Sequence, residues 1–157
     1  MTKLIGILGG SFNPVHNGHL MLASYIAQYG PVDSVWLMLS PCNPFKVGNE
    51  MAPDEQRYAM LQLACDGSGV VSCCDMELGM PRPSYTISTL RELKATFPGY
   101  RFKLIIGSDN LINFPKWRES ESILEEFGLI VYPRPGYSTD SVVDDRITVV
   151  EAPVVGI

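Results

Sequence analysis

Two histidines lie three residues apart in a glycine-rich segment that begins at Gly9 and ends at His19. This segment follows the apolar run Lys3–Leu8 and leads into a helical pattern over His19–Tyr29. Because His16 and His19 are three residues apart, they lie on the same side of a first helical turn. Because a helix N-terminus attracts anions, we predict a phosphate site with two imidazole donors. The alternative is that each histidine caps the helix or fills a pocket.

Apolar runs and helical patterns alternate along the chain, which predicts an α/β fold with a doubly wound parallel sheet in three layers, α/β/α. The predicted strands are Lys3–Leu8, Ser34–Leu39, Val70–Cys74, Arg101–Ile106, Leu129–Tyr132 and Ile147–Val150. The predicted helices are His19–Tyr29, Asp54–Cys65, Thr86–Phe97 and Glu119–Phe127. In such a sheet, ligands bind beyond the carboxyl ends of the strands, near the point where the strand order reverses.

The composition fits one domain over residues 1–157, with 46% hydrophobic and 18% charged residues. A formal net charge of −5 argues against a nucleic-acid partner. The chain has no long apolar run and no signal-peptide pattern at its N-terminus, so we expect a soluble, cytoplasmic protein without a membrane partner. The sequence leaves open whether the chain forms a homo-oligomer.

Four cysteines occur, and none forms a CxxC pair or lies at metal-ligand spacing from a histidine. We expect Cys42, Cys65, Cys73 and Cys74 to be reduced thiols in or near the core, with no protein-ligated metal. Cys73 and Cys74 are neighbours on a predicted strand, so their side chains should point to opposite faces.

The segment GSFNPVHNGHL resembles the GxFxPxHxGH signature of the HxGH nucleotidylyltransferases. Further motifs narrow the resemblance to the nicotinate-nucleotide adenylyltransferases: Ser40–Lys46, Arg57 with Met60–Ala64, Pro83–Thr86 with Thr89 and Leu90, Gly107–Asp109, Trp117, and Arg134–Gly136. The resemblance implies a Rossmann-like nucleotidylyltransferase fold. It also implies transfer of AMP from ATP to nicotinate mononucleotide, giving nicotinate adenine dinucleotide and pyrophosphate in NAD synthesis.

In such a reaction the attacking phosphate is already ionised, since its second pKa is about 6. Positioning and charge stabilisation therefore do most of the catalysis. The resemblance assigns His16 and His19 to the α-phosphate and Lys46 to phosphate binding, with His19 as the donor to the transition state. The alternative for Lys46 is a solvated surface lysine. Magnesium is expected to bind mainly through the ATP phosphates.

The remaining binding residues fall into two sets. The predicted ATP set comprises the two histidines, the loop after the first strand, a ribose-binding carboxylate and an arginine on the adenosine side. Besides the histidines, its members are Gly9, Gly10, Ser11, Phe12, Gly107, Asp109 and Arg134. The alternative for Asp109 is a helix N-cap. The predicted nicotinate set is Ser11, Lys46, Tyr85, Thr86 and Trp117. There, the amide region of Thr86 would receive the carboxylate and Trp117 would stack on the pyridine ring, unless Trp117 is ordinary core.

Three departures from the family pattern stand out. Asn13 replaces the usual Asp, and Phe45 replaces the usual His. The family continues with an Ile-Ser-Ser/Thr pattern and an arginine that hold the β- and γ-phosphates, whereas this chain ends at Ile157, so we expect that segment to be missing.

Two alternative functions stay open. A phosphopantetheine adenylyltransferase shares the fold and chemistry but usually has Thr in place of His16. A nucleotide-binding module without turnover would keep the same crevice. A dehydrogenase is disfavoured because the loop is not GxGxxG, and a Ser/His hydrolase because no GxSxG elbow follows a strand.

Overall fold

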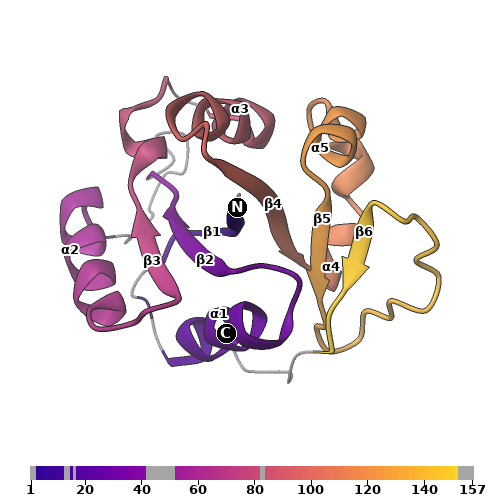
Figure 1. Cartoon of the computed structure of the whole chain (residues 1–157), viewed down its shortest axis with the longest axis horizontal. Helices are drawn as coiled ribbons and strands as arrows, with labels where there is room; N and C mark the ends of the chain where they lie inside the picture. Colours follow the sequence, from indigo (N-terminus) through magenta and orange to yellow (C-terminus); the bar gives the residue numbers. More distant parts are fainter. Residues whose placement is uncertain (1–2, 13–14, 16, 42–51, 82–83, 152–157) are drawn as a thin grey trace.

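The computed structural model describes residues 3–12, 15, 17–41, 52–81 and 84–151 (Figure 1). Within them lies a six-stranded sheet with the order β3-β2-β1-β4-β5-β6, in which every neighbouring pair is parallel. The strands are β1 (Lys3–Gly10), β2 (Ser34–Leu39), β3 (Val71–Cys74), β4 (Tyr100–Gly107), β5 (Leu129–Tyr132) and β6 (Ile147–Val149). The predicted strands and the parallel, doubly wound sheet are confirmed.

Five α-helices and two short 3₁₀ helices complete the described chain. The α-helices are α1 (Asn17–Tyr29), α2 (Asp54–Cys65), α3 (Thr86–Thr96), α4 (Ser108–Leu111) and α5 (Ser120–Glu126). The 3₁₀ helices are η1 (Met76–Gly79) and η2 (Phe114–Lys116). The predicted long helices agree with α1, α2, α3 and α5 to within two residues at each end. The short elements η1, α4 and η2 were not predicted, because a single turn is too short to show a helical period.

The helices cover both faces of the sheet, as the three-layer prediction requires. In Figure 1, α3 and α5 lie on one side of the sheet and α1 on the other. One hydrophobic core joins α1 and α2 to the sheet through Leu22, Ile26 and Leu61. The second core joins α3 and α5 to the opposite face through Leu90 and Ile123. None of the helices in the described ranges is long and apolar enough to span a membrane.

The strands read as continuous apolar runs because both of their faces are buried. In β1, Leu8 belongs to the core under α1, whereas Ile5 and Ile7 belong to the core under α3. On β3, Cys73 and Cys74 likewise pack against opposite cores, so their side chains point to opposite faces of the sheet, as predicted. Among the described cysteines, Cys65, Cys73 and Cys74 are free thiols, and Cys42 lies outside the described residues.

The strand order reverses at β1, which pairs with β2 on one side and β4 on the other. The connection through α1 runs outward to β2, and the chain later returns to β4 on the opposite side. Connections that leave β1 and β4 in opposite directions open a crevice beyond the carboxyl ends of the two strands. The loops that follow β1, β4 and β5 meet at this edge.

Candidate functional site

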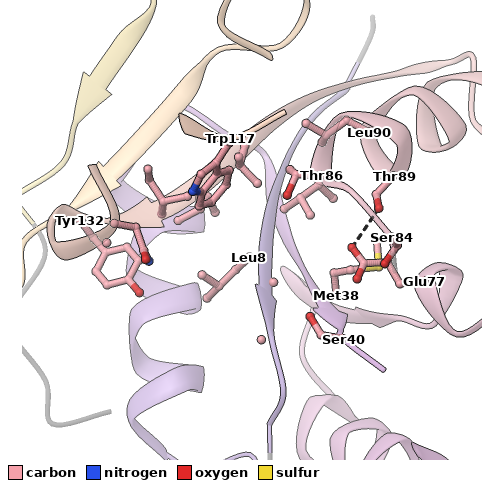
Figure 2. Close-up of a pocket in the computed structure, with 18 residues that line it drawn as sticks. Leu8, Met38, Ser40, Glu77, Ser84, Thr86, Thr89, Leu90, Trp117 and Tyr132 are labelled. Atoms are coloured by element: carbon pink, nitrogen blue, oxygen red, sulfur yellow. Dashed lines mark hydrogen bonds between the residues drawn. The ribbon is translucent and has the colours of Figure 1, made fainter. Parts of the chain in front are cut away.

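Two cavities lie side by side at the carboxyl ends of β1, β4 and β5. The larger cavity, of about 300 Å³, is bounded by residues from η1 and α3 and by Trp117, which follows η2 (Figure 2). Its polar lining consists chiefly of Ser40, Glu77, Ser84, Thr86, Thr89, Asn110 and Trp117. The smaller cavity, of about 200 Å³, lies beside the start of α1 and is lined in part by Phe12, His19, Asp109 and Arg134.

The two cavities share one wall. Leu8, Gly9, Gly10 and Tyr132 line both of them. Gly9 and Gly10 carry no side chain, so backbone is exposed along the junction. The arrangement suits two ligands that meet over the Gly9-Gly10 backbone.

The structure brings most predicted residues to one cavity or the other. The smaller cavity collects the predicted ATP residues Gly9, Gly10, Phe12, His19, Asp109 and Arg134. The larger cavity collects Thr86 and Trp117 from the predicted nicotinate set, together with Gly107 from the ATP set. Two predicted residues, Ser11 and Tyr85, line neither cavity. His16 and Lys46 lie outside the described residues.

The turn after β1 holds His19 against an aromatic ring. Phe12 has a left-handed backbone with φ of 42°, which is uncommon for a bulky residue, and its side chain is buried. The Phe12 ring contacts the His19 ring edge to face, with centroids 5.0 Å apart and an interplanar angle of 85°. A Cβ on Gly10 would come within 3.2 Å of the Phe12 ring, so glycine suits that position. Strain at a turn of this kind is typical of functional sites.

Gly107 allows three side chains to converge beside the shared wall. A Cβ at this position would lie 2.5 Å from Asp109 Oδ1, 3.0 Å from Arg134 Cγ and 3.1 Å from Tyr132 Cζ. The hydroxyl of Ser108 accepts a hydrogen bond from the Arg134 backbone N–H at 2.8 Å, which ties the start of α4 to the end of β5. Burial and the Asp109 carboxylate both raise the pKa of Tyr132.

Asp109 does not cap α4. The N-cap residue is Gly107, with no side-chain capping bond, and Asp109 lies within the first turn of the helix. The N-cap alternative for Asp109 is therefore wrong, because the helix begins two residues earlier than that role requires. Its half-buried carboxylate lines the smaller cavity instead.

Arg57 is fully buried and ties together the loops that follow β1 and β2. Its Nη1 donates to the Ser11 carbonyl at 2.7 Å and to the Ser40 carbonyl at 2.9 Å. Its Nε donates to the Ala52 carbonyl at 2.9 Å, and its Nη2 pairs with Asp54 at the start of α2. The Ser11 carbonyl therefore serves as an acceptor for Arg57.

Glu77 was not predicted, yet its carboxylate lines the larger cavity. Thr89 Oγ1 donates to Glu77 Oε2 at 3.0 Å (Figure 2), and the Ser84 hydroxyl makes a second side-chain hydrogen bond. Burial raises the pKa of Glu77, and these two hydrogen bonds oppose the rise. No spacing pattern in the sequence points to Glu77, because it lies on the short helix η1.

Trp117 and Tyr85 differ in position. Trp117 directly follows η2 and packs against Phe114 with ring centroids 5.2 Å apart. It is half-buried and lines the larger cavity. Tyr85 precedes α3 and is 41% exposed, with the Arg118 guanidinium 4.1 Å from its ring centroid. Thr86 is the first residue of α3, so the predicted helix start is confirmed.

The described residues contain no group of three or more His, Cys, Asp and Glu side chains placed to hold a metal ion. Among the described residues that line the smaller cavity, Asp109 is the one carboxylate.

Comparison with known proteins shows what this chain is similar to. The sequence profile of the cytidylyltransferase-like family matches residues 7–155. A Bacteroides fragilis protein named "Probable nicotinate-nucleotide adenylyltransferase" is 47% identical over 150 residues, which span 95% of this chain and 75% of the relative. A protein of the same name from Christiangramia forsetii is 38% identical over 160 residues, spanning all of this chain and 82% of the relative.

A solved structure shares the fold. It is the Plasmodium falciparum nicotinic acid mononucleotide adenylyltransferase complexed with NaAD, with a TM-score of 0.76 and 21% identity. The similarity covers 98% of this chain and 77% of the other. The Rossmann-like architecture predicted from the sequence is confirmed.

Arg57→Met tests the buried network. The substitution keeps an apolar stem but removes the Arg57 donor from three carbonyl oxygens and from Asp54, so we expect the free energy of unfolding to fall by about 3–5 kcal/mol. Urea denaturation would measure it. Arg101→Met, at an exposed position on β4, is the matched control and should change stability by no more than about 0.5 kcal/mol. Equal losses in the two variants would contradict a tethering role for Arg57.

Proposed function

Because the chain belongs to the nicotinate-nucleotide adenylyltransferase family, we propose that it transfers AMP from ATP to nicotinate mononucleotide, in NAD synthesis. The phosphate oxygen of the mononucleotide forms a bond to the α-phosphorus of ATP while the bond to the β-phosphate oxygen breaks. The products are nicotinate adenine dinucleotide and pyrophosphate.

The shared wall of the two cavities is the observation that best supports this proposal. A transfer between two nucleotides needs two binding regions whose ligands meet at the transferred phosphorus. The smaller cavity would take ATP and the larger cavity the pyridine nucleotide. The α-phosphate would then lie over Gly9 and Gly10, which line both cavities. Backbone N–H groups of Gly10, Ser11 and Phe12 are the proposed donors to its oxygens.

His19 lies where it could stabilise charge on that phosphate. Its half-buried ring lines the smaller cavity, and the edge-to-face contact with Phe12 restricts its orientation. We assign His16 to the same phosphate and Lys46 to phosphate binding on the strength of the motif alone. Preorganised donors of this kind need no reorganisation as charge develops.

Asp109 and Arg134 lie on the ATP side. Asp109 would accept hydrogen bonds from ribose hydroxyls, and Arg134 would lie beside the adenosine. We propose that Mg²⁺ binds through ATP phosphate oxygens, with Asp109 as the carboxylate of the smaller cavity that could also reach it. When bound, the ion neutralises phosphate charge.

The larger cavity would hold the pyridine ring. Trp117 offers an aromatic face at its wall, and Thr86 begins α3, where unpaired backbone N–H groups favour an anion such as a carboxylate. Tyr85 does not line this cavity, so we place its contact with the nucleotide at the rim.

Pyrophosphate release with ATP and Mg²⁺ tests the activity. We expect release with nicotinate mononucleotide, less with nicotinamide mononucleotide, and none with phosphopantetheine. Release with phosphopantetheine alone would favour the related adenylyltransferase. Quenching of tryptophan fluorescence by nicotinate mononucleotide without any release would favour a binding module.

His19→Ala should lower turnover by about 10²–10⁴-fold, since it removes a donor to the α-phosphate. Steady-state pyrophosphate release measures the effect, and circular dichroism checks the fold. Gln28→Ala, at an exposed position of the same helix, is the control and should retain turnover. Near-normal turnover in His19→Ala would remove this residue from the mechanism.

Trp117→Ala should raise KM for nicotinate mononucleotide more than KM for ATP, because stacking on the pyridine ring is lost. Initial rates over a matrix of both substrates give the two constants. Trp36→Phe is the control, since Trp36 packs against Phe97 and Phe102 and lines neither cavity. An equal rise in both KM values would indicate that Trp117 acts only in packing.

A further inference from the structure

Glu77 lies in the larger cavity, and the proposed mechanism gives it no role. Among the described residues that line this cavity, none is Lys, Arg or His. A nicotinate carboxylate bound there would share the cavity with the Glu77 carboxylate. Two carboxylates in one partly dehydrated site repel each other, and the repulsion favours protonation of one of them.

Two hydroxyl groups hold the Glu77 side chain in place. Thr89 Oγ1 lies 3.0 Å from Glu77 Oε2, and the Ser84 hydroxyl forms the second bond. Ser84 and Thr89 stand on either side of Thr86 in the sequence. Glu77 is therefore attached to the turn of chain that is proposed to receive the nicotinate carboxylate.

This network accommodates Glu77 in either protonation state. Thr89 has one hydroxyl hydrogen but two acceptors within reach, Glu77 Oε2 at 3.0 Å and the Tyr85 carbonyl at 3.3 Å. When Glu77 is ionised, the hydroxyl donates to its carboxylate. When Glu77 is protonated, its own O–H can donate to Thr89 Oγ1 while the threonine hydrogen turns to Tyr85. No backbone movement is required.

Among the described residues, the groups around Glu77 come from β2, β3 and α3. From β3, Cys74 faces it, and burial raises the pKa of that thiol, with Glu77 adding to the rise. From β2, the apolar Met38 lines the same cavity, and from α3 the Thr89 hydroxyl bonds to Glu77, with Ser84 just before the helix. Burial has already raised the pKa of Glu77 before any ligand enters.

We propose that Glu77 is a specificity-determining residue that sets the preference between the acid and amide forms of the pyridine nucleotide, and that the acid form binds with uptake of a proton by Glu77. The inference rests on the proposed function. By linkage, a ligand that raises the pKa of Glu77 binds more tightly once Glu77 is protonated. Its affinity therefore rises as the pH falls. The amide form carries no such charge and lacks this dependence.

Calorimetric titration of the wild type, Glu77→Gln and Glu92→Gln with nicotinate mononucleotide and nicotinamide mononucleotide tests the proposal. Glutamine keeps an oxygen that accepts hydrogen bonds from Thr89 and Ser84 but carries no charge. Glu92 is exposed on α3, so its variant removes one charge outside the cavity. Both ligands carry the same phosphate, whose titration cancels in the ratio of the two Kd values.

In the wild type, we expect the affinity for the acid form relative to the amide form to rise about tenfold between mildly alkaline and mildly acidic pH. In Glu77→Gln, the ratio should be independent of pH and about tenfold higher at alkaline pH than in the wild type. Glu92→Gln should behave as the wild type. A ratio that is unchanged by Glu77→Gln, or a selective loss of affinity for the acid form, would overturn the proposal.

Proton uptake gives a second measurement that needs no variant. Titrations of the wild type in buffers of different ionisation enthalpy should show proton uptake with the acid form and less with the amide form. Equal uptake for both forms would overturn the role of Glu77 and leave the proposed function standing. If neither nucleotide binds the wild type, the proposed function itself fails.

Discussion

A single buried guanidinium keeps the shared wall of the two cavities in shape. Arg57 binds the carbonyls of Ser11 and Ser40, which follow β1 and β2, and anchors both to the start of α2. The Ser40 backbone N–H also donates to the Gly10 carbonyl at 2.8 Å, so the two loops are joined directly as well. A buried charge is tolerated only when it is paired and hydrogen-bonded, and here the loop carbonyls meet that need. The site geometry and the burial of Arg57 therefore depend on each other.

Glycine provides the space that this geometry needs. Gly10 leaves room for the Phe12 ring, and Gly107 leaves room for Asp109, Arg134 and Tyr132. Both glycines end strands, at the edge of the sheet that carries the two cavities. The absence of a side chain at each position lets these neighbouring side chains approach the backbone closely.

The two cavities differ in charge. The smaller cavity combines His19, Arg134 and Asp109, a mixture suited to phosphate, ribose and a phosphate-bound cation. The larger cavity has Glu77 as its charged group among the described lining residues, together with hydroxyls and the Trp117 ring. In the proposed arrangement, a phosphate would lie near the basic side chains of the smaller cavity, and a pyridine carboxylate would lie near the backbone N–H groups at the start of α3. This contrast makes the protonation state of one glutamate important for the choice of ligand.

The sequence by itself determined the strands, the long helices and the edge of the sheet that carries the site. Buried parallel strands and amphipathic helices leave strong local patterns, and the motif around His19 occupies the turn that those patterns predict. Other features could be decided only by the tertiary structure. Glu77 and Thr89 are twelve residues apart on different elements, Arg57 meets Ser11 across 46 positions, and Tyr132 reaches the shared wall from β5. Such contacts depend on how separate elements pack, and a contact between two particular residues leaves no periodic pattern in the chain.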